Sequence, residues 1–275
     1  MTIRLARALS LPSILLAAAA CAGVSPAPSG APMSPVRIFT GSVMLRGEPF
    51  ELHLAQPAAP RQPDVLVLYA SGDGGWFGAA VDMFKAIGES GFCSVGLSSR
   101  TLLHRKLPGG HSPAIADVAE DYRTIVDYAS TALHLPLDRR VVLTGWSRGA
   151  SLAVLTGGAH HAMPGLAGVI AIGLAEDENL AVVSDSDDDP DETPAGRDAS
   201  NLQLYPLLAQ VAPRRVAVIQ STGDAYLHAA RARELFGPDT KNRRFFGVTA
   251  KNHRFSGGAE AFATALKSAL AWVVE

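Results

Sequence analysis

The segment GWSRG at positions 145–149 has the residue types and spacing of a nucleophile elbow, a sharp turn that presents a serine. It follows the apolar run 141–145 and precedes a predicted helix over 148–157, which is the strand–turn–helix context that such a turn needs. Glycines two positions before and after the serine are required because larger side chains would collide in the turn. The start of the helix also favours negative charge that develops nearby. Ser147 is therefore the predicted nucleophile.

A serine nucleophile needs a histidine as base and an acid that orients the histidine. Asp224 follows the apolar run 216–221, and His253 follows the predicted strand 243–250. The order serine, acid, histidine is the one that accompanies a nucleophile elbow. Strand ends in a parallel sheet meet at one edge, so three neighbouring strands would bring these side chains together. We predict Ser147, Asp224 and His253 as the catalytic triad.

Other residues compete for these roles. Asp224 is also suited to cap the helix predicted near 225–236, and the two roles are compatible. The competing acids are Glu176 and Asp177, which follow the run 166–174. The competing histidines are His228, predicted within a helix, and His104 and His111, predicted in a loop as substrate contacts at most.

An acyl-transfer site also needs backbone amides that bind the oxyanion. The segment SGDGGW at 71–76 follows the apolar run 64–70, and its glycines let the backbone turn N–H groups towards a pocket. We predict that the amides of Asp73 and Arg148 form this site. A plain glycine-rich turn or a phosphate cradle is the alternative, although the Lys-Ser/Thr end of a nucleotide P-loop is missing. The predicted substrate contacts are Gly72, Gly74, Trp76, Trp146 and Arg105.

The elements that must position these residues alternate along the chain. Two alternating segments are typical of half-buried antiparallel strands, and repeated strand–helix units follow them. This order predicts an α/β fold with a mostly parallel eight-stranded sheet and helices on both faces. The predicted strands are 36–45, 49–55, 64–70, 93–97, 141–145, 166–174, 216–221 and 243–250, and the predicted helices are 79–90, 113–133, 148–157, 225–236 and a final one ending at Trp272.

Composition bounds the possible functions. The chain has 275 residues, 48% hydrophobic and 18% charged, with a net charge of −2, so it can bury a sizeable core and is not mainly disordered. A sequence pI near 6.4 argues against general nucleic-acid binding. Two cysteines are too few for a disulfide framework or a four-thiolate zinc site, and Cys93 is expected to fill core space. We predict no metal and no cofactor.

The N-terminus has the pattern of an export signal. Arg4 and Arg7 precede an apolar stretch, and small residues lead to Cys21. Residues 1–21 are predicted to be a signal peptide of lipoprotein type, with lipid attached to Cys21, and 22–35 a flexible tether rich in Pro, Ala, Gly and Ser. Cleavage near Ala20 or Ala22 into a soluble secreted protein is the alternative. Either reading places the domain outside the cytoplasm; the first predicts a membrane-anchored periplasmic lipoprotein.

A strongly acidic segment interrupts the second half of the chain. Residues 176–198 contain ten carboxylates and one arginine, within a lid-like insertion predicted at about 175–212. They could attract a cationic group, bind calcium or form a solvated loop. The loop 100–111, with Arg100, Arg105 and Lys106, is a basic counterpart that could hold a lipid phosphate or be solvated.

Taken together, these motifs resemble the α/β-hydrolase fold over residues 36–275. The string SGDGGW together with GWSRGAS, from Leu66 to about Leu155, resembles the AcvB/VirJ family of exported bacterial hydrolases, a virulence-associated family. That resemblance implies hydrolysis of aminoacyl esters of phosphatidylglycerol at the periplasmic membrane face. The alternatives are a general carboxylesterase or lipase, a peptidase, and a non-catalytic envelope binding protein on the same fold. The oligomeric state is left open.

Overall fold

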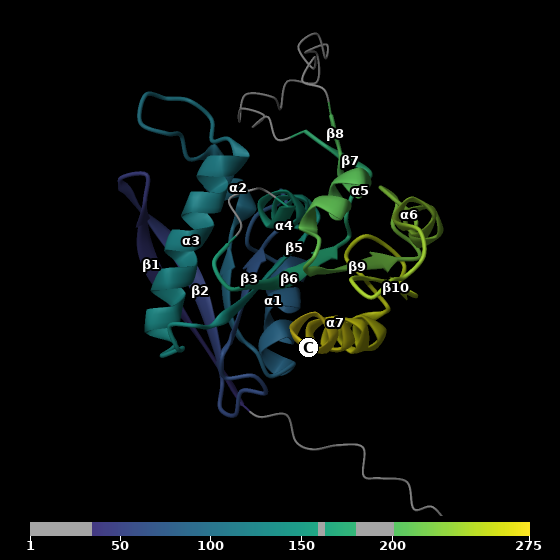
Figure 1. Ribbon diagram of the computed structural model, residues 1–275, viewed down its shortest axis with the longest axis horizontal. Helices are drawn as coiled ribbons and strands as arrows, with labels where there is room; N and C mark the ends of the chain where they lie inside the picture. The colour runs from purple at the N-terminus through teal and green to yellow at the C-terminus, as the bar shows by residue number, and fades with distance from the viewer. Residues whose placement is uncertain (1–34, 159–162, 180–200) are drawn as a thin grey trace, which may run out of the picture. The chain divides into compact units, whose positions relative to one another are not determined.

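A mixed eight-stranded sheet forms the centre of the computed structural model, which describes residues 35–158, 163–179 and 201–275 (Figure 1). Its strand order is β1-β2-β4-β3-β5-β6-β9-β10. Strand β2 pairs antiparallel with β1 and β4, and every later pair is parallel. The strands are β1 (Val36–Leu45), β2 (Glu48–Pro57), β3 (Val65–Ala70), β4 (Cys93–Leu97), β5 (Arg140–Trp146), β6 (Leu166–Ile172), β9 (Arg215–Ser221) and β10 (Arg243–Val248). The predicted fold class, an α/β-hydrolase fold, is confirmed.

Helices cover both faces of this sheet (Figure 1). Helices α1 and α7 pack on one face, and α3, α4 and α6 pack on the other. Consecutive residues of β3 alternate between these two apolar clusters, because side chains of a strand point to opposite faces in turn. The helices are α1 (Ala79–Glu89), α2 (Ser99–His104), α3 (Ile115–Ala132), α4 (Arg148–Gly158), α5 (Leu204–Leu207), α6 (Ala229–Phe236) and α7 (Ala259–Val274).

Two local expectations were wrong. The segment 100–111 is not all loop, because α2 begins directly after β4, where the Ser98 hydroxyl accepts a hydrogen bond from the Thr101 amide at 3.2 Å. Helix α6 begins at Ala229 rather than near residue 225, and His228 is its N-cap. Cys93 is buried at 1% exposure, as predicted.

The described part of the acidic insertion contains a short two-stranded ribbon. Strands β7 (Asp177–Glu178) and β8 (Leu202–Gln203) pair antiparallel, and α5 follows β8. Residues 180–200, which include the rest of the acidic segment, lie outside the described residues, as do the predicted signal peptide, Cys21 and nearly all of the predicted tether. Among the helices that the structure describes, none is long and apolar enough to cross a membrane.

Candidate active site

Ser147 stands on a strained turn between β5 and α4. Its φ of +56° lies in the left-handed region, which a non-glycine residue adopts only when the surroundings enforce it. The neighbouring glycines explain how the turn closes. A Cβ on Gly149 would lie 2.1 Å from the Ala70 carbonyl oxygen, and one on Gly145 would lie 2.3 Å from the Gly149 backbone. The strand–turn–helix context predicted for the nucleophile is therefore present.

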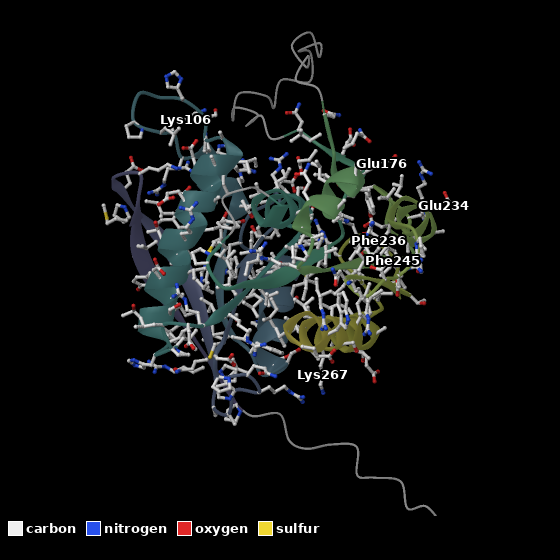
Figure 2. The ribbon with its side chains drawn as sticks, in the orientation of Figure 1. Lys106, Glu176, Glu234, Phe236, Phe245 and Lys267 are labelled. Atoms are coloured by element: carbon white, nitrogen blue, oxygen red, sulfur yellow. The ribbon has the colours of Figure 1, made fainter. Side chains whose placement is uncertain are left out.

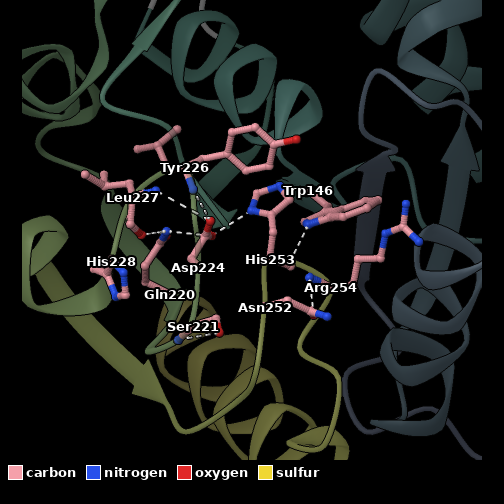
Figure 3. A network of polar contacts seen from close by, with 12 residues as sticks. Trp146, Gln220, Ser221, Asp224, Tyr226, Leu227, His228, Asn252, His253 and Arg254 are labelled. Atoms are coloured by element: carbon pink, nitrogen blue, oxygen red, sulfur yellow. Dashed lines mark hydrogen bonds and ion pairs between the residues drawn. The ribbon is translucent and has the colours of Figure 1, made fainter.

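His253 and Asp224 are joined by a short hydrogen bond (Figure 3). His253 Nδ1 lies 2.6 Å from Asp224 Oδ2, and the Asp224 side chain is fully buried. The same carboxylate accepts hydrogen bonds from the Gln220 side-chain amide at 3.0 Å and the Tyr226 backbone amide at 2.9 Å. His253 Nε2 is buried and has no hydrogen-bond partner among the described residues. This leaves one imidazole nitrogen fixed by an acid and the other available to a hydroxyl.

The competing acids have other partners. Glu176 forms an ion pair with Arg231 at 3.4 Å, and Asp177 accepts a hydrogen bond from Asn201 at 2.6 Å. Asp224 does not cap α6; its carboxylate instead fixes the turn that precedes this helix. Of the three candidate acids, Asp224 alone contacts the histidine in the described structure.

Gly173, which the sequence analysis did not single out, leaves room for the His253 imidazole over the end of β6. The strands before Ser147, Asp224 and His253 are not three neighbours as expected, because β6 lies between β5 and β9. Gly173 follows β6 with φ +60°, and a Cβ there would lie 2.8 Å from His253 Cε1. Its lack of a side chain opens a path for the imidazole over the end of β6. A glycine that ends an apolar strand is too common a signal to have identified this role.

The predicted oxyanion loop lies directly beside the elbow. A Cβ on Gly72 would lie 3.3 Å from Ser147 Cβ. The Gly72 carbonyl accepts a hydrogen bond from the Ser99 hydroxyl at 2.9 Å, and the Ser99 amide donates to the Ser71 hydroxyl at 3.2 Å, so the start of α2 holds this loop. No role at the site was predicted from the sequence for either serine. The Arg148 amide is the first of α4 and has no acceptor within that helix.

Two aromatic side chains flank the imidazole (Figure 3). The Trp146 indole lies 5.2 Å from the imidazole ring centre and donates a hydrogen bond to the His253 carbonyl oxygen at 3.1 Å. The ring of Tyr226 meets the imidazole edge-on at 4.9 Å and is 79% exposed. Trp146, predicted as a substrate contact, therefore also ties the histidine loop to the nucleophile strand. Tyr226 was missed because it follows the acid without a recognisable motif.

The other predicted contacts have partners of their own. Trp76 stacks on His53 with ring centres 4.2 Å apart and packs against the core. Gly74 lies against Phe77. The Arg105 guanidinium donates to three backbone carbonyls of the β1–β2 hairpin, at residues 45, 48 and 49. The neighbouring Lys106 lies on the β1 side of the domain in Figure 2, on the opposite side of the view from Glu176.

Within the part of the chain that the structure describes, no group of three or more His, Cys, Asp or Glu side chains is placed to hold a metal ion. Most of the acidic segment considered for calcium lies beyond that part.

Known proteins of similar structure share this fold. The sequence matches no family model and no curated protein. An esterase domain from Rhodothermus marinus aligns over 86% of this chain and 97% of its own, with a TM-score of 0.56 and 18% identity. Est1E from Butyrivibrio proteoclasticus aligns over 86% and 99%, with a TM-score of 0.55 and 16% identity. An α/β serine hydrolase without a lid from Xanthomonas campestris aligns over 88% and 97%, with a TM-score of 0.53 and 13% identity. The fold is that of the α/β serine hydrolases.

Proposed function

We propose that this protein is a serine hydrolase that cleaves carboxylic esters through an acyl-enzyme. The observation that carries the proposal is the buried Asp224 carboxylate, 2.6 Å from His253 Nδ1, on the same edge of the sheet as the strained Ser147. In this mechanism the Ser147 hydroxyl attacks the ester carbonyl carbon while His253 Nε2 accepts its proton. The Asp73 and Arg148 amides then stabilise the oxyanion.

The remaining steps follow from the same groups. The protonated His253 gives its proton to the departing alcohol oxygen, and the acyl group stays on Ser147. Water then attacks the acyl-enzyme with His253 again as base, which releases the acid and restores the serine. Asp224 stabilises the imidazolium form and holds Nδ1 protonated throughout.

For the substrate, we propose aminoacyl esters of phosphatidylglycerol at the periplasmic membrane face. The resemblance of SGDGGW and GWSRGAS to the AcvB/VirJ family and the signal-like N-terminus ending in Cys21 support this choice. A general carboxylesterase is the second candidate, and it is favoured by the structural similarity to proteins described as esterases.

The test is release of free amino acid from lysyl- and alanyl-phosphatidylglycerol by the purified protein. A short-chain nitrophenyl ester is assayed beside it, and Ser147→Ala is the control. Release that disappears in Ser147→Ala supports both the mechanism and the substrate. Turnover of the simple ester alone supports the mechanism and rejects the aminoacyl-lipid substrate. No turnover, together with no labelling of Ser147 by a fluorophosphonate, would indicate a non-catalytic binding protein.

A further inference from the structure

A largely buried carboxylate, that of Glu178, lies at the start of the elbow helix and has no part in the mechanism above. Glu178 belongs to β7, and its side chain is 11% exposed. One of its oxygens accepts a hydrogen bond from the Ser151 hydroxyl at 2.9 Å, and the other lies 3.4 Å from Arg148 Nε. Glu178 therefore contacts the first turn of α4, which begins one residue after Ser147.

Among the residues that the structure describes, the charged groups that act on Glu178 are Arg148 and Asp73, the two residues predicted to supply the oxyanion amides. Burial raises the pKa of Glu178, the Arg148 guanidinium opposes that rise, and the negative charge of Asp73 adds to it. The Arg148 contact is an ion pair, with Nε of Arg148 3.4 Å from the Glu178 carboxylate. Glu178 thus contacts the side chain of one residue predicted to supply an oxyanion amide, Arg148.

A carboxylate in this position has a cost for the proposed reaction. Negative charge develops on the substrate oxygen beside the Asp73 and Arg148 amides, and a second negative charge nearby raises the energy of that state. The effect is stronger than in water because the site is partly screened from solvent. The Arg148 side chain lies where it can cancel the Glu178 charge.

We propose that Arg148 and Glu178 form a compensated charge pair, in which the Arg148 side chain cancels the carboxylate that would otherwise oppose oxyanion formation. This inference rests on the proposed function and assigns the Arg148 side chain a positioning role distinct from that of its backbone amide. It also gives the β7–β8 ribbon, at the base of the acidic insertion, a direct influence on the nucleophile turn.

The experiment compares Arg148→Met, Arg148→Lys, Glu178→Gln and the double variant Arg148→Met/Glu178→Gln on a nitrophenyl ester. Asp177→Asn is the matched control, because Asp177 is a carboxylate of the same strand that contacts Asn201 instead. Arg148→Met is expected to lower kcat at least about tenfold at pH 8 with little change in KM. Arg148→Lys is expected to retain most of the kcat of the unmodified protein. Adding Glu178→Gln is expected to restore kcat to within about threefold of the unmodified protein. Asp177→Asn is expected to leave kcat unchanged.

The pH dependence separates charge compensation from simple packing. In Arg148→Met the loss of kcat is expected to be larger at pH 8 than at pH 5, because the raised pKa of Glu178 leaves more of this carboxyl protonated, and so uncharged, at the lower pH. A merely structural role predicts equal losses at both pH values, and losses that accumulate in the double variant. Either result would overturn the charge-pair inference while leaving the hydrolase proposal intact. Absence of ester turnover in the unmodified protein would overturn both, and thermal unfolding of each variant verifies that it is folded.

Discussion

Replacing Asp224 by Asn tests the histidine–acid pair most directly, because the amide can enter this site in only two orientations. If its NH₂ group faces the amides of Tyr226 and Leu227, it meets two backbone donors that cannot rearrange, at the positions now 2.9 and 3.5 Å from Oδ1. If the NH₂ group faces His253 and Gln220, it meets side chains that can adapt. The second orientation is therefore expected.

That orientation changes which imidazole nitrogen carries the proton. His253 Nδ1 must then accept a hydrogen bond from the amide, so its proton moves to Nε2 and the ring can no longer take a proton from Ser147. The corresponding loss in serine hydrolases is about 10⁴-fold in kcat, which corresponds to about 5.5 kcal/mol of transition-state stabilisation. The protein should remain folded, because the shape of the side chain is unchanged.

The assay is the steady-state and pre-steady-state hydrolysis of a nitrophenyl ester, with thermal unfolding as the check on folding. Glu176→Gln is the matched control, since this competing acid pairs with Arg231 instead of the histidine and should retain kcat within about twofold. If Asp224→Asn stays within tenfold of the unmodified protein while Ser147→Ala is inactive, the tautomer argument is wrong. A large loss in Glu176→Gln would show that the acid had been misassigned.

Three further variants test the surroundings of the site and the fold. Trp146→Phe keeps an aromatic side chain but removes the 3.1 Å hydrogen bond to the histidine loop, so kcat should fall about three- to tenfold in steady-state assays, with Tyr226→Phe as the unchanged control. Gly149→Ala should lower the free energy of unfolding by at least about 1–3 kcal/mol in urea titrations, because its Cβ meets a carbonyl oxygen at 2.1 Å, whereas Gly247→Ala, 3.9 Å from its nearest neighbour, should not. Arg46→Met leaves the buried Asp121 carboxylate without its cation and should cost about 3–5 kcal/mol. Burial already raises the pKa of Asp121, so protonation of this carboxyl in the folded state relieves the cost of the unpaired charge at low pH. Urea titrations of Arg46→Met should therefore show a smaller loss in the free energy of unfolding at pH 5 than at pH 8. An equal loss at both pH values would contradict this reasoning.

Much of the fold and of the candidate site could be predicted from residue patterns alone. Strands such as Val65–Ala70 are apolar on both faces, and that pattern by itself indicates a covered parallel sheet. The elbow could be recognised because Gly145 and Gly149 leave room that no other residue allows. The order of Ser147, Asp224 and His253 followed from the ends of three strands, and the structure brings Asp224 and His253 together.

Which side chains from distant segments contact one another was decided by the tertiary structure. Because the strand order places β6 between β5 and β9, the absence of a side chain at Gly173 leaves the space that the His253 ring occupies. The pairing of Glu178 with Arg148, and of Trp146 with the histidine loop, joins residues 30 and 107 positions apart. Local sequence does not predict such pairs, because each depends on how segments far apart along the chain approach one another in the folded protein. The residue types therefore determined which chemistry was available, while packing determined which groups face one another.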